Sequence, residues 1–324
     1  MAKETRGTFF SERVWPVVRA LVLQLLLMMG IIGGLVAILV FTVLVDQLQW
    51  LHIDFHGQTM ETISPEGKIW GLSIIFAVNL LLTIGAWRLL ERKRLSGMLW
   101  KFSRDQWRPL LWGLLAGLGE VLLVFGGMLL FGVVHPRWGL SAVSPKTVAM
   151  ALGWVFASSV IGPIAEEVLN RGYWFQNIKR GWGIVTATVV TSLLFGGLHL
   201  LNPNAEILGA VNIALSAAVW VLGMLWLRSL WFPIGWHAAW NFAQFFVVGL
   251  PNSGISVSSM GLEGSTLLVS ELSGSHWLTG GDFGMEASLF KTIILIMVLV
   301  GTLWLKKTMV AKSAREQFLE SRQI

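Results

Sequence analysis

The chain has 324 residues, of which 55% are hydrophobic and 13% are charged, about half the charged share of a soluble domain. The mean hydropathy of +0.69 argues against a cytosolic globular protein and excludes a disordered chain. The absence of cysteine excludes disulfides, cysteine zinc sites and thiol catalysis. The net charge of +6 does not indicate a nucleic-acid partner, because the cations lie in short loops between apolar runs.

Eight apolar stretches are long enough to be membrane helices, since roughly 20 apolar residues cross the ~30 Å hydrocarbon layer. They cover about residues 17–45, 70–90, 109–134, 148–175, 183–200, 206–227, 231–250 and 288–305. The first is too long for a secretory signal, and no small-residue cleavage pattern follows it, so we expect it to be retained. The predicted fold is therefore an all-α polytopic membrane protein with about eight transmembrane helices.

The charges in the loops predict the orientation of the helices. Cations occupy the two termini and alternate loops, namely Lys3, Arg6, Arg13 and Arg19, then Arg88, Arg92, Lys93, Arg94, Lys101, Arg104 and Arg108, then Lys179, Arg180 and Arg228, and finally Lys306, Lys307, Lys312, Arg315 and Arg322. The intervening loops are poor in cations. The positive-inside rule then puts both termini in the cytoplasm of a protein that we expect in the plasma membrane.

Three regions follow from these patterns. Residues 1–146 hold N-terminal helices and a basic cytoplasmic loop, and 147–250 hold most of the polar residues that lie inside predicted spans. Residues 251–324 contain a Gly- and Ser-rich stretch over 251–284, which predicts an extracytoplasmic loop, then the last helix and a cytoplasmic tail. We find no internal repeat and no separate soluble domain.

Ionisable side chains inside a bilayer are costly and indicate functional sites. The predicted spans contain Glu120, Glu166, Glu167, Arg171, His199 and His237, together with the uncharged Asn79, Asn170, Asn212 and Asn241. Glu120 has no partner one helical turn away. It is therefore either paired with a His or Arg of another helix, or protonated.

Adjacent carboxylates stand out in the fourth predicted span. Pro163 removes a backbone hydrogen bond just before the pair and so loosens the helix there. Glu167 and Arg171 are four residues apart, so they can pair on one face, whereas Glu166 points about 100° away. This spacing suits one structural and one reactive carboxylate. The alternative is that all three form an interfacial salt-bridge cluster.

Two histidines and an amide complete the set of polar candidates. His237 and Asn241 are four residues apart on one face of the seventh helix, with small alanines between them that allow close approach. A polar contact between helices is the alternative reading for both. His199 stands alone in an apolar span, where a hydrogen-bonded core histidine is the alternative.

These groups fit two kinds of hydrolytic chemistry. A carboxylate or imidazole can deprotonate water while other donors face the developing oxyanion, and Glu166 with His199 can share that water. Two histidines and a glutamate also match a catalytic zinc shell with an open position. The sequence has no H-E-x-x-H helix, and no G-x-S-x-G or Ser-Lys pair supports a serine nucleophile.

The order and spacing of the polar residues resemble the signatures of CAAX-protease-like membrane proteins, the CPBP or Abi family, which includes the type II CAAX prenyl endopeptidase. The motifs are Glu166-Glu167-x-x-x-Arg171, Phe195-x-x-x-His199 and His237-x-x-x-Asn241. The resemblance covers about residues 147–250. Each motif is weak alone, but three in order on predicted membrane helices are specific.

The resemblance implies an all-helical bundle and a role for each matched residue. Glu166 would be the base that activates water, with His199 as its partner, and His237 with Asn241 would bind the oxyanion. Zinc and a metal-free glutamate mechanism are equally open.

Two further residues take supporting roles by the same resemblance. Glu167 and Arg171 would orient the site. Asn170 departs from the family pattern, in which an apolar or aromatic residue more often precedes Arg-Gly, and this bears on substrate preference more than on activity.

The predicted helix boundaries conflict with such a site. At 1.5 Å per residue, His199 lies ~24 Å from Gly183, whereas Glu166 lies only ~13 Å from the expected end of its own helix. The two meet in a cavity between the fourth, fifth and seventh helices if the fourth helix continues past Phe175, or if the fifth begins deeper.

The favoured function is an intramembrane endopeptidase that cuts a membrane-anchored or membrane-docked peptide. The alternative is a non-catalytic membrane scaffold or bacteriocin-immunity protein of the same fold, which a lost active-site group would indicate. A transporter or proton relay is a third class, but neither a repeat nor a pair of broken helices supports it.

Overall fold

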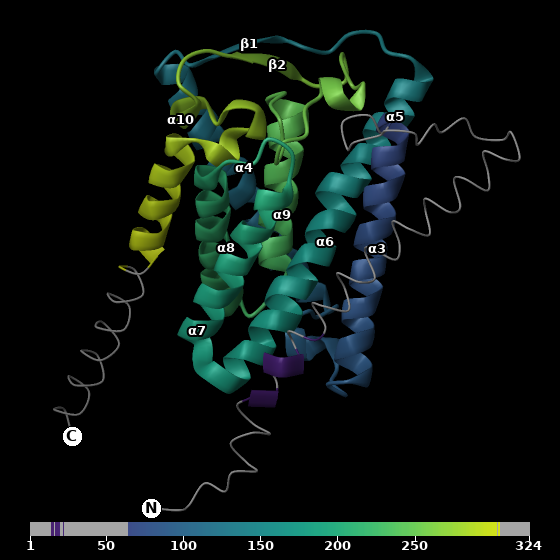
Figure 1. Ribbon diagram of the computed structural model, residues 1–324, viewed down its shortest axis with the longest axis vertical. Coiled ribbons are helices and arrows are strands. Elements are labelled where there is room, and N and C mark those ends of the chain that lie inside the picture. The colour runs from purple at the N-terminus through teal and green to yellow at the C-terminus, as the bar shows by residue number, and fades with distance from the viewer. Residues whose placement is uncertain (1–13, 16, 20–21, 23–63, 303, 305–324) are drawn as a thin grey trace, which may run out of the picture.

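The computed structural model describes residues 14–15, 17–19, 22, 64–302 and 304, which form a mostly helical bundle (Figure 1). Four helical runs in this part of the chain are long and apolar enough to cross a membrane. They are α3 (Pro65–Leu89), the run Arg104–Leu130 that contains α4 (Trp107–Leu130), the continuous run Pro145–Leu201, and α8 (Ile207–Leu227). The length and apolar composition of these helices indicate an integral membrane protein.

The run Pro145–Leu201 joins the fourth and fifth predicted spans. It comprises α5 (Pro145–Val155), a π-helical stretch Phe156–Ile161, α6 (Gly162–Glu167), a second π-helical stretch Val168–Trp174, α7 (Phe175–Leu198) and a 3₁₀ turn His199–Leu201. The π-helical turns flank α6, so the backbone is irregular on both sides of the paired carboxylates.

The chain turns sharply within α7, at Gly183. Its φ of 85° and ψ of 173° lie in a region that glycine adopts at little cost (Figure 1). The helix therefore continues past Phe175, which is one of the alternatives that the depth argument left open. Glu166 lies ~26 Å and His199 ~24 Å along the chain's helices from this turn, so they reach a similar depth.

The remaining predicted spans are the seventh, the eighth and the first. The seventh corresponds to α9 (Trp231–Phe242) and a π-helical stretch Ala243–Val247, and the eighth to an apolar helix Leu289–Thr302. The first, 17–45, falls almost wholly outside the described part, so the total of eight stays a prediction. Short helical turns occur at Leu95–Met98, Arg104–Gln106, Ser258–Met260, α10 (His276–Thr279), Gly281–Phe283 and Met285–Ala287.

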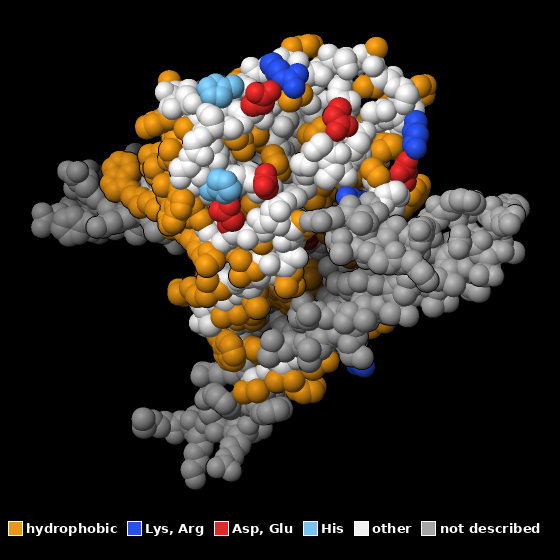
Figure 2. All heavy atoms as spheres, turned by 45° about the horizontal axis from the view of Figure 1, so that its top comes forward, with side chains coloured by type: hydrophobic (Ala, Val, Ile, Leu, Met, Phe, Trp, Pro, Cys, Tyr) orange, Lys and Arg blue, Asp and Glu red, His pale blue; other side chains and the backbone are white. Residues whose placement is uncertain are grey.

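A small antiparallel ribbon lies at the end of the bundle opposite the Gly183 turn (Figure 1). It pairs β1 (Val134–Trp138) with β2 (Leu268–Leu272), with Pro136 opposite Ser270. The predicted loop 251–284 thus contains a strand and short helices. Figure 2 shows that this end is largely polar, while hydrophobic side chains cover the side of the bundle below it.

The helix α9 lies at the centre of the bundle and packs against α4 through glycines. A Cβ atom on Gly113 would lie 2.1 Å from the Phe232 carbonyl oxygen, and one on Gly117 would lie 2.4 Å from the Trp236 carbonyl oxygen. The two backbones therefore touch, and this contact sets the position of α9 and of the polar residues on its other face.

Gly117→Ala is expected to destabilise the protein by about 1–3 kcal/mol, because the added methyl group forces the two backbones apart. The matched control is Gly119→Ala on the same helix, where no atom lies within 4 Å of the new Cβ. Thermal unfolding of the purified variants in detergent measures the difference. Equal melting temperatures for the two variants would contradict the contact.

Candidate active site

A buried ion pair forms the innermost part of the site. Glu167 and Arg171 have fully buried side chains, and Arg171 Nη1 donates to Glu167 Oε1 over 2.9 Å. His237 Nδ1 lies 3.0 Å from the same oxygen. The spacing of four residues thus gives the expected pair, and α9 adds a histidine to it.

Aromatic rings enclose the guanidinium of Arg171. Its central carbon lies 4.4 Å from the ring centre of Phe195 and 5.1 Å from that of Trp220. The imidazole of His237 stacks on Trp220, with centroids 5.0 Å apart and planes at 27°. Cation–π contacts and the Glu167 carboxylate together compensate a charge that is removed from water. These contacts also fix the plane of the His237 ring.

Glu166 has a different environment from its neighbour. Its side chain is 26% exposed, whereas that of Glu167 is fully buried. Its Oε2 lies 3.8 Å from His237 Nε2, which is too far for a hydrogen bond, and this oxygen has no hydrogen-bond partner in the described part of the chain. Glu166 Oε2 is therefore free to accept a hydrogen bond, while Glu167 Oε1 lies within hydrogen-bonding distance of both Arg171 and His237.

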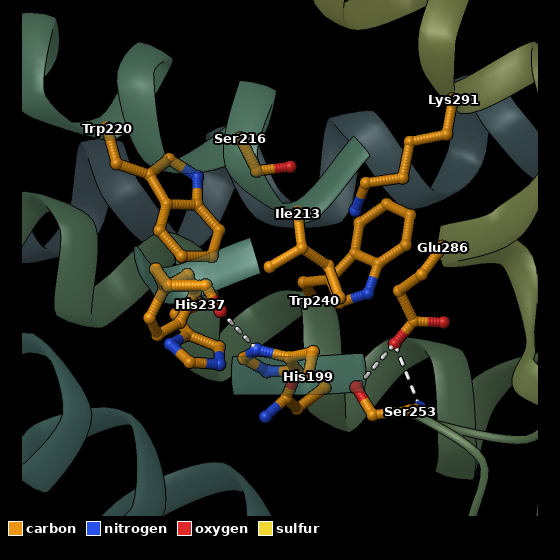
Figure 3. A pocket seen from close by; sticks show the side chains of 11 residues that line it. His199, Ile213, Ser216, Trp220, His237, Trp240, Ser253, Glu286 and Lys291 are labelled. Carbon is orange, nitrogen blue, oxygen red and sulfur yellow. Dashed lines mark hydrogen bonds between the residues drawn. The ribbon is translucent and has the colours of Figure 1, made fainter. Parts of the chain in front are cut away.

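A cavity of about 20 Å³ brings three predicted residues together, namely His199, His237 and Asn241 (Figure 3). Such a volume holds about one water molecule. Its walls come from the end of α7, from α8 and α9, and from the segment around residues 253–291. Glu166, Glu167 and Arg171 do not line this cavity, and they contact it through His237.

Backbone carbonyls orient the other two polar residues. His199 Nδ1 lies 2.7 Å from the Phe195 carbonyl oxygen, so Nδ1 carries the proton and Nε2 is an acceptor. Asn241 Nδ2 donates to the carbonyl oxygen of Ser158, in the first π-helical stretch, over 2.8 Å. Of the two imidazoles, that of His237 on α9 faces Glu166, with Nε2 at 3.8 Å from Glu166 Oε2.

The zinc shell of Glu166, His199 and His237, which the sequence left open as an alternative, does not fit this geometry. Among the described residues, no group of three or more His, Asp or Glu side chains is placed to hold a metal ion. His237 Nδ1 is committed to Glu167. We therefore derive no step through a metal.

Lys291 is a cavity residue that the sequence argument missed. It is 2% exposed, its Nζ lies 3.6 Å from Glu120 Oε1, and it sits 3.1 Å above the Trp240 ring. Trp236 Nε1 donates to the other oxygen of Glu120 over 2.6 Å. The partners of Glu120 are therefore a lysine and an indole, whereas the two alternatives drawn from the sequence were a His or Arg partner and a protonated carboxyl group. Lys291 lies inside the predicted span 288–305, so the search for ionisable residues in spans had the signal to find it.

Glu286 is a further acidic residue that lines the cavity. Its Oε1 accepts from the Ser253 backbone nitrogen over 3.0 Å and from Ser253 Oγ over 3.1 Å, as Figure 3 shows. Its Oε2 accepts from Gln244 Nε2. Both carboxylate oxygens are therefore committed to structural bonds.

Residues 148–243 match the family model described as Rce1-like, type II CAAX prenyl endopeptidase Rce1-like. The matched range contains all six predicted site residues. No curated protein and no solved structure gives a significant match. Rce1-like proteins are a protease family. The comparison thus bears out the resemblance seen in the three motifs, and residues 148–243 are similar to that family.

Proposed function

We propose that the protein is an intramembrane endopeptidase that hydrolyses a peptide bond of a membrane-associated protein or peptide with water activated by Glu166. The observation that carries this proposal is that the two adjacent carboxylates have different hydrogen-bonding partners. Glu167 accepts from Arg171 and faces His237 Nδ1, whereas Glu166 Oε2 has no donor and faces the same imidazole. The Rce1-like match supports peptide hydrolysis as the reaction.

The reaction follows from these contacts. Glu166 takes a proton from water, and the resulting hydroxide adds to the carbonyl carbon of the substrate. The tetrahedral intermediate carries an oxyanion, for which Asn241 has a second N–H beyond the one it gives to Ser158. As the C–N bond breaks, the proton on Glu166 passes to the leaving amine. His199 and His237 line the cavity beside this centre, and the Nε2 atom of each ring, an acceptor in the tautomers described, holds water.

Glu167 and Arg171 have an indirect role in this proposal. A proton on His237 Nδ1 would be donated to Glu167 Oε1, and this choice of tautomer leaves Nε2 towards Glu166. Arg171 holds the buried Glu167 carboxylate in place through a contact of 2.9 Å. The pair is therefore a positioning device for His237.

The substrate reaches the site by a change in the cavity, since a volume of about 20 Å³ admits water and no peptide. The walls contributed by the segment around residues 253–291 lie outside the range that matches the family.

The orientation of the protein in the membrane is part of the proposal. Cationic segments meet at the end of the bundle that carries the Gly183 turn, where Arg180 contacts Glu91 over 3.1 Å and Leu230 N donates to the Leu99 carbonyl over 3.0 Å. By the positive-inside rule, this end would face the cytoplasm of a plasma-membrane protein, together with both termini.

The metal-free mechanism predicts that chelators leave cleavage unchanged. The test purifies the protein in detergent, measures bound metal by elemental analysis, and follows cleavage of a membrane-peptide library with and without a chelator. The expected result is cleavage without stoichiometric zinc. Stoichiometric zinc with chelator-sensitive cleavage would contradict it, and a folded protein that cleaves nothing would favour a scaffold.

A further inference from the structure

One wall of the cavity carries hydrogen-bond donors that have no acceptor. Ser216 Oγ and Trp240 Nε1 are buried without a partner in the described part of the chain. Lys291 Nζ reaches its carboxylate partner only at 3.6 Å, beyond hydrogen-bonding distance. All three residues line the cavity. Figure 3 shows Ser216 and Lys291 on one side and His199 and His237 on the other.

Buried donors without acceptors are rare in folded proteins, and each calls for an explanation. Glu286 is a carboxylate that lines the same cavity, but it does not accept a hydrogen bond from these donors. Its two oxygens are already occupied by Ser253 and Gln244. The donors of this wall are therefore available to a bound molecule that brings oxygen acceptors.

The charges around Lys291 indicate whether the bound acceptor is neutral or charged. Glu120 pairs with its ammonium group, and Glu286 lines the same cavity. A carboxylate from the substrate would be a third acid beside one ammonium group in a low-dielectric site, which is unfavourable. A neutral carbonyl oxygen adds no charge and can accept from ammonium, hydroxyl and indole donors.

We propose that Lys291, Ser216 and Trp240 form a subsite that binds backbone carbonyl oxygens of the peptide next to the scissile bond. This subsite rests on the proposed endopeptidase function and extends it. Lys291 comes from a helix beyond the Rce1-like match, so the cationic part of the subsite is supplied by the C-terminal region of this chain.

A purely structural ion pair between Lys291 and Glu120 is the competing explanation, and a double variant separates the two. Glu120→Gln with Lys291→Met removes both charges together, so no buried charge is left unpaired. The glutamine still offers an oxygen to Trp236 Nε1, which keeps α9 tied to α4. Melting temperature in detergent verifies that the variant folds.

The experiment uses a peptide that the wild-type protein cleaves, found in a membrane-peptide library. The double variant is expected to raise KM about tenfold or more, with kcat changed far less, because a hydrogen bond from a charged donor to bound substrate is lost. Glu120→Gln alone keeps the Lys291 donor, so its KM is expected near the wild-type value, whereas its melting temperature is expected to fall because the buried ammonium group loses its carboxylate.

A second series of peptides tests the carbonyl directly. An alkene isostere replaces, one at a time, each amide that flanks the scissile bond. At one position the isostere is expected to raise KM for the wild type and to have no further effect in the double variant, because both changes remove the same bond.

The outcomes separate the subsite from the proposed function. Wild-type cleavage that depends on Glu166, with an unchanged KM in the double variant, overturns the subsite and leaves the function standing. The subsite is also overturned if, at every position, the isostere raises KM in the double variant by the same factor as in the wild type. A wild-type protein that cleaves no peptide overturns both.

Discussion

Glu166→Gln is expected to lower the cleavage rate by about 10³-fold, because glutamine keeps the shape of the side chain but cannot take a proton from water. Positioned general bases contribute on the order of 10²–10⁴ to a rate. The side chain makes no hydrogen bond through Oε2 and is partly exposed, so its loss costs little stability. Cleavage of a wild-type substrate and the melting temperature, both measured in detergent, provide the test.

The matched control for this variant is Glu263→Gln, the same change at an exposed position outside the site. It is expected to cleave at the wild-type rate and to melt at the wild-type temperature. Undiminished cleavage by Glu166→Gln would show that another group activates water. A large fall in its melting temperature would show that Glu166 belongs to the structural cluster.

Arg171→Met is expected to lower the free energy of unfolding by about 3–5 kcal/mol, because it leaves the Glu167 carboxylate buried without its cation. The guanidinium also packs between Phe195 and Trp220, so contact is lost as well as charge. Thermal unfolding in detergent and the amount of protein in the membrane provide the measurements.

Two further variants separate charge from packing. Glu167→Gln is expected to reduce activity without abolishing it, and to lower expression, because Arg171 loses the charge of its partner. The double variant Glu167→Gln with Arg171→Met is expected to regain part of the stability, since no buried charge remains unpaired. Normal expression and full activity of Glu167→Gln would show that the ion pair has no role in positioning His237.

Local spacing predicted those parts of the site that lie within one helix. The separation of four residues put Glu167 beside Arg171, and His237 and Asn241 on one face, because a helix brings such positions together. The comparison of depths left two alternatives, a longer fourth helix or a deeper start of the fifth, and the turn at Gly183 corresponds to the first of them. The roles of these residues stay predictions.

Contacts between distant segments could not be predicted in the same way. The bond from Asn241 to the Ser158 carbonyl depends on a π-helical turn, which residue spacing does not reveal. The pair of Glu120 and Lys291 joins helices far apart in the chain, and no periodicity relates them. The β1–β2 ribbon likewise pairs segments on either side of the whole site.

The hairpin formed around Gly183 has a consequence for how the chain can vary in length. One extra residue in either arm would move the residues beyond it by about 1.5 Å and rotate them by about 100° relative to the other arm. Such a change would turn Glu166 or His199 away from the site. Extra residues at the bend itself would leave both arms in phase. Related chains can therefore be expected to differ in length at the bend and to keep a constant length between each end of the hairpin and its polar residue.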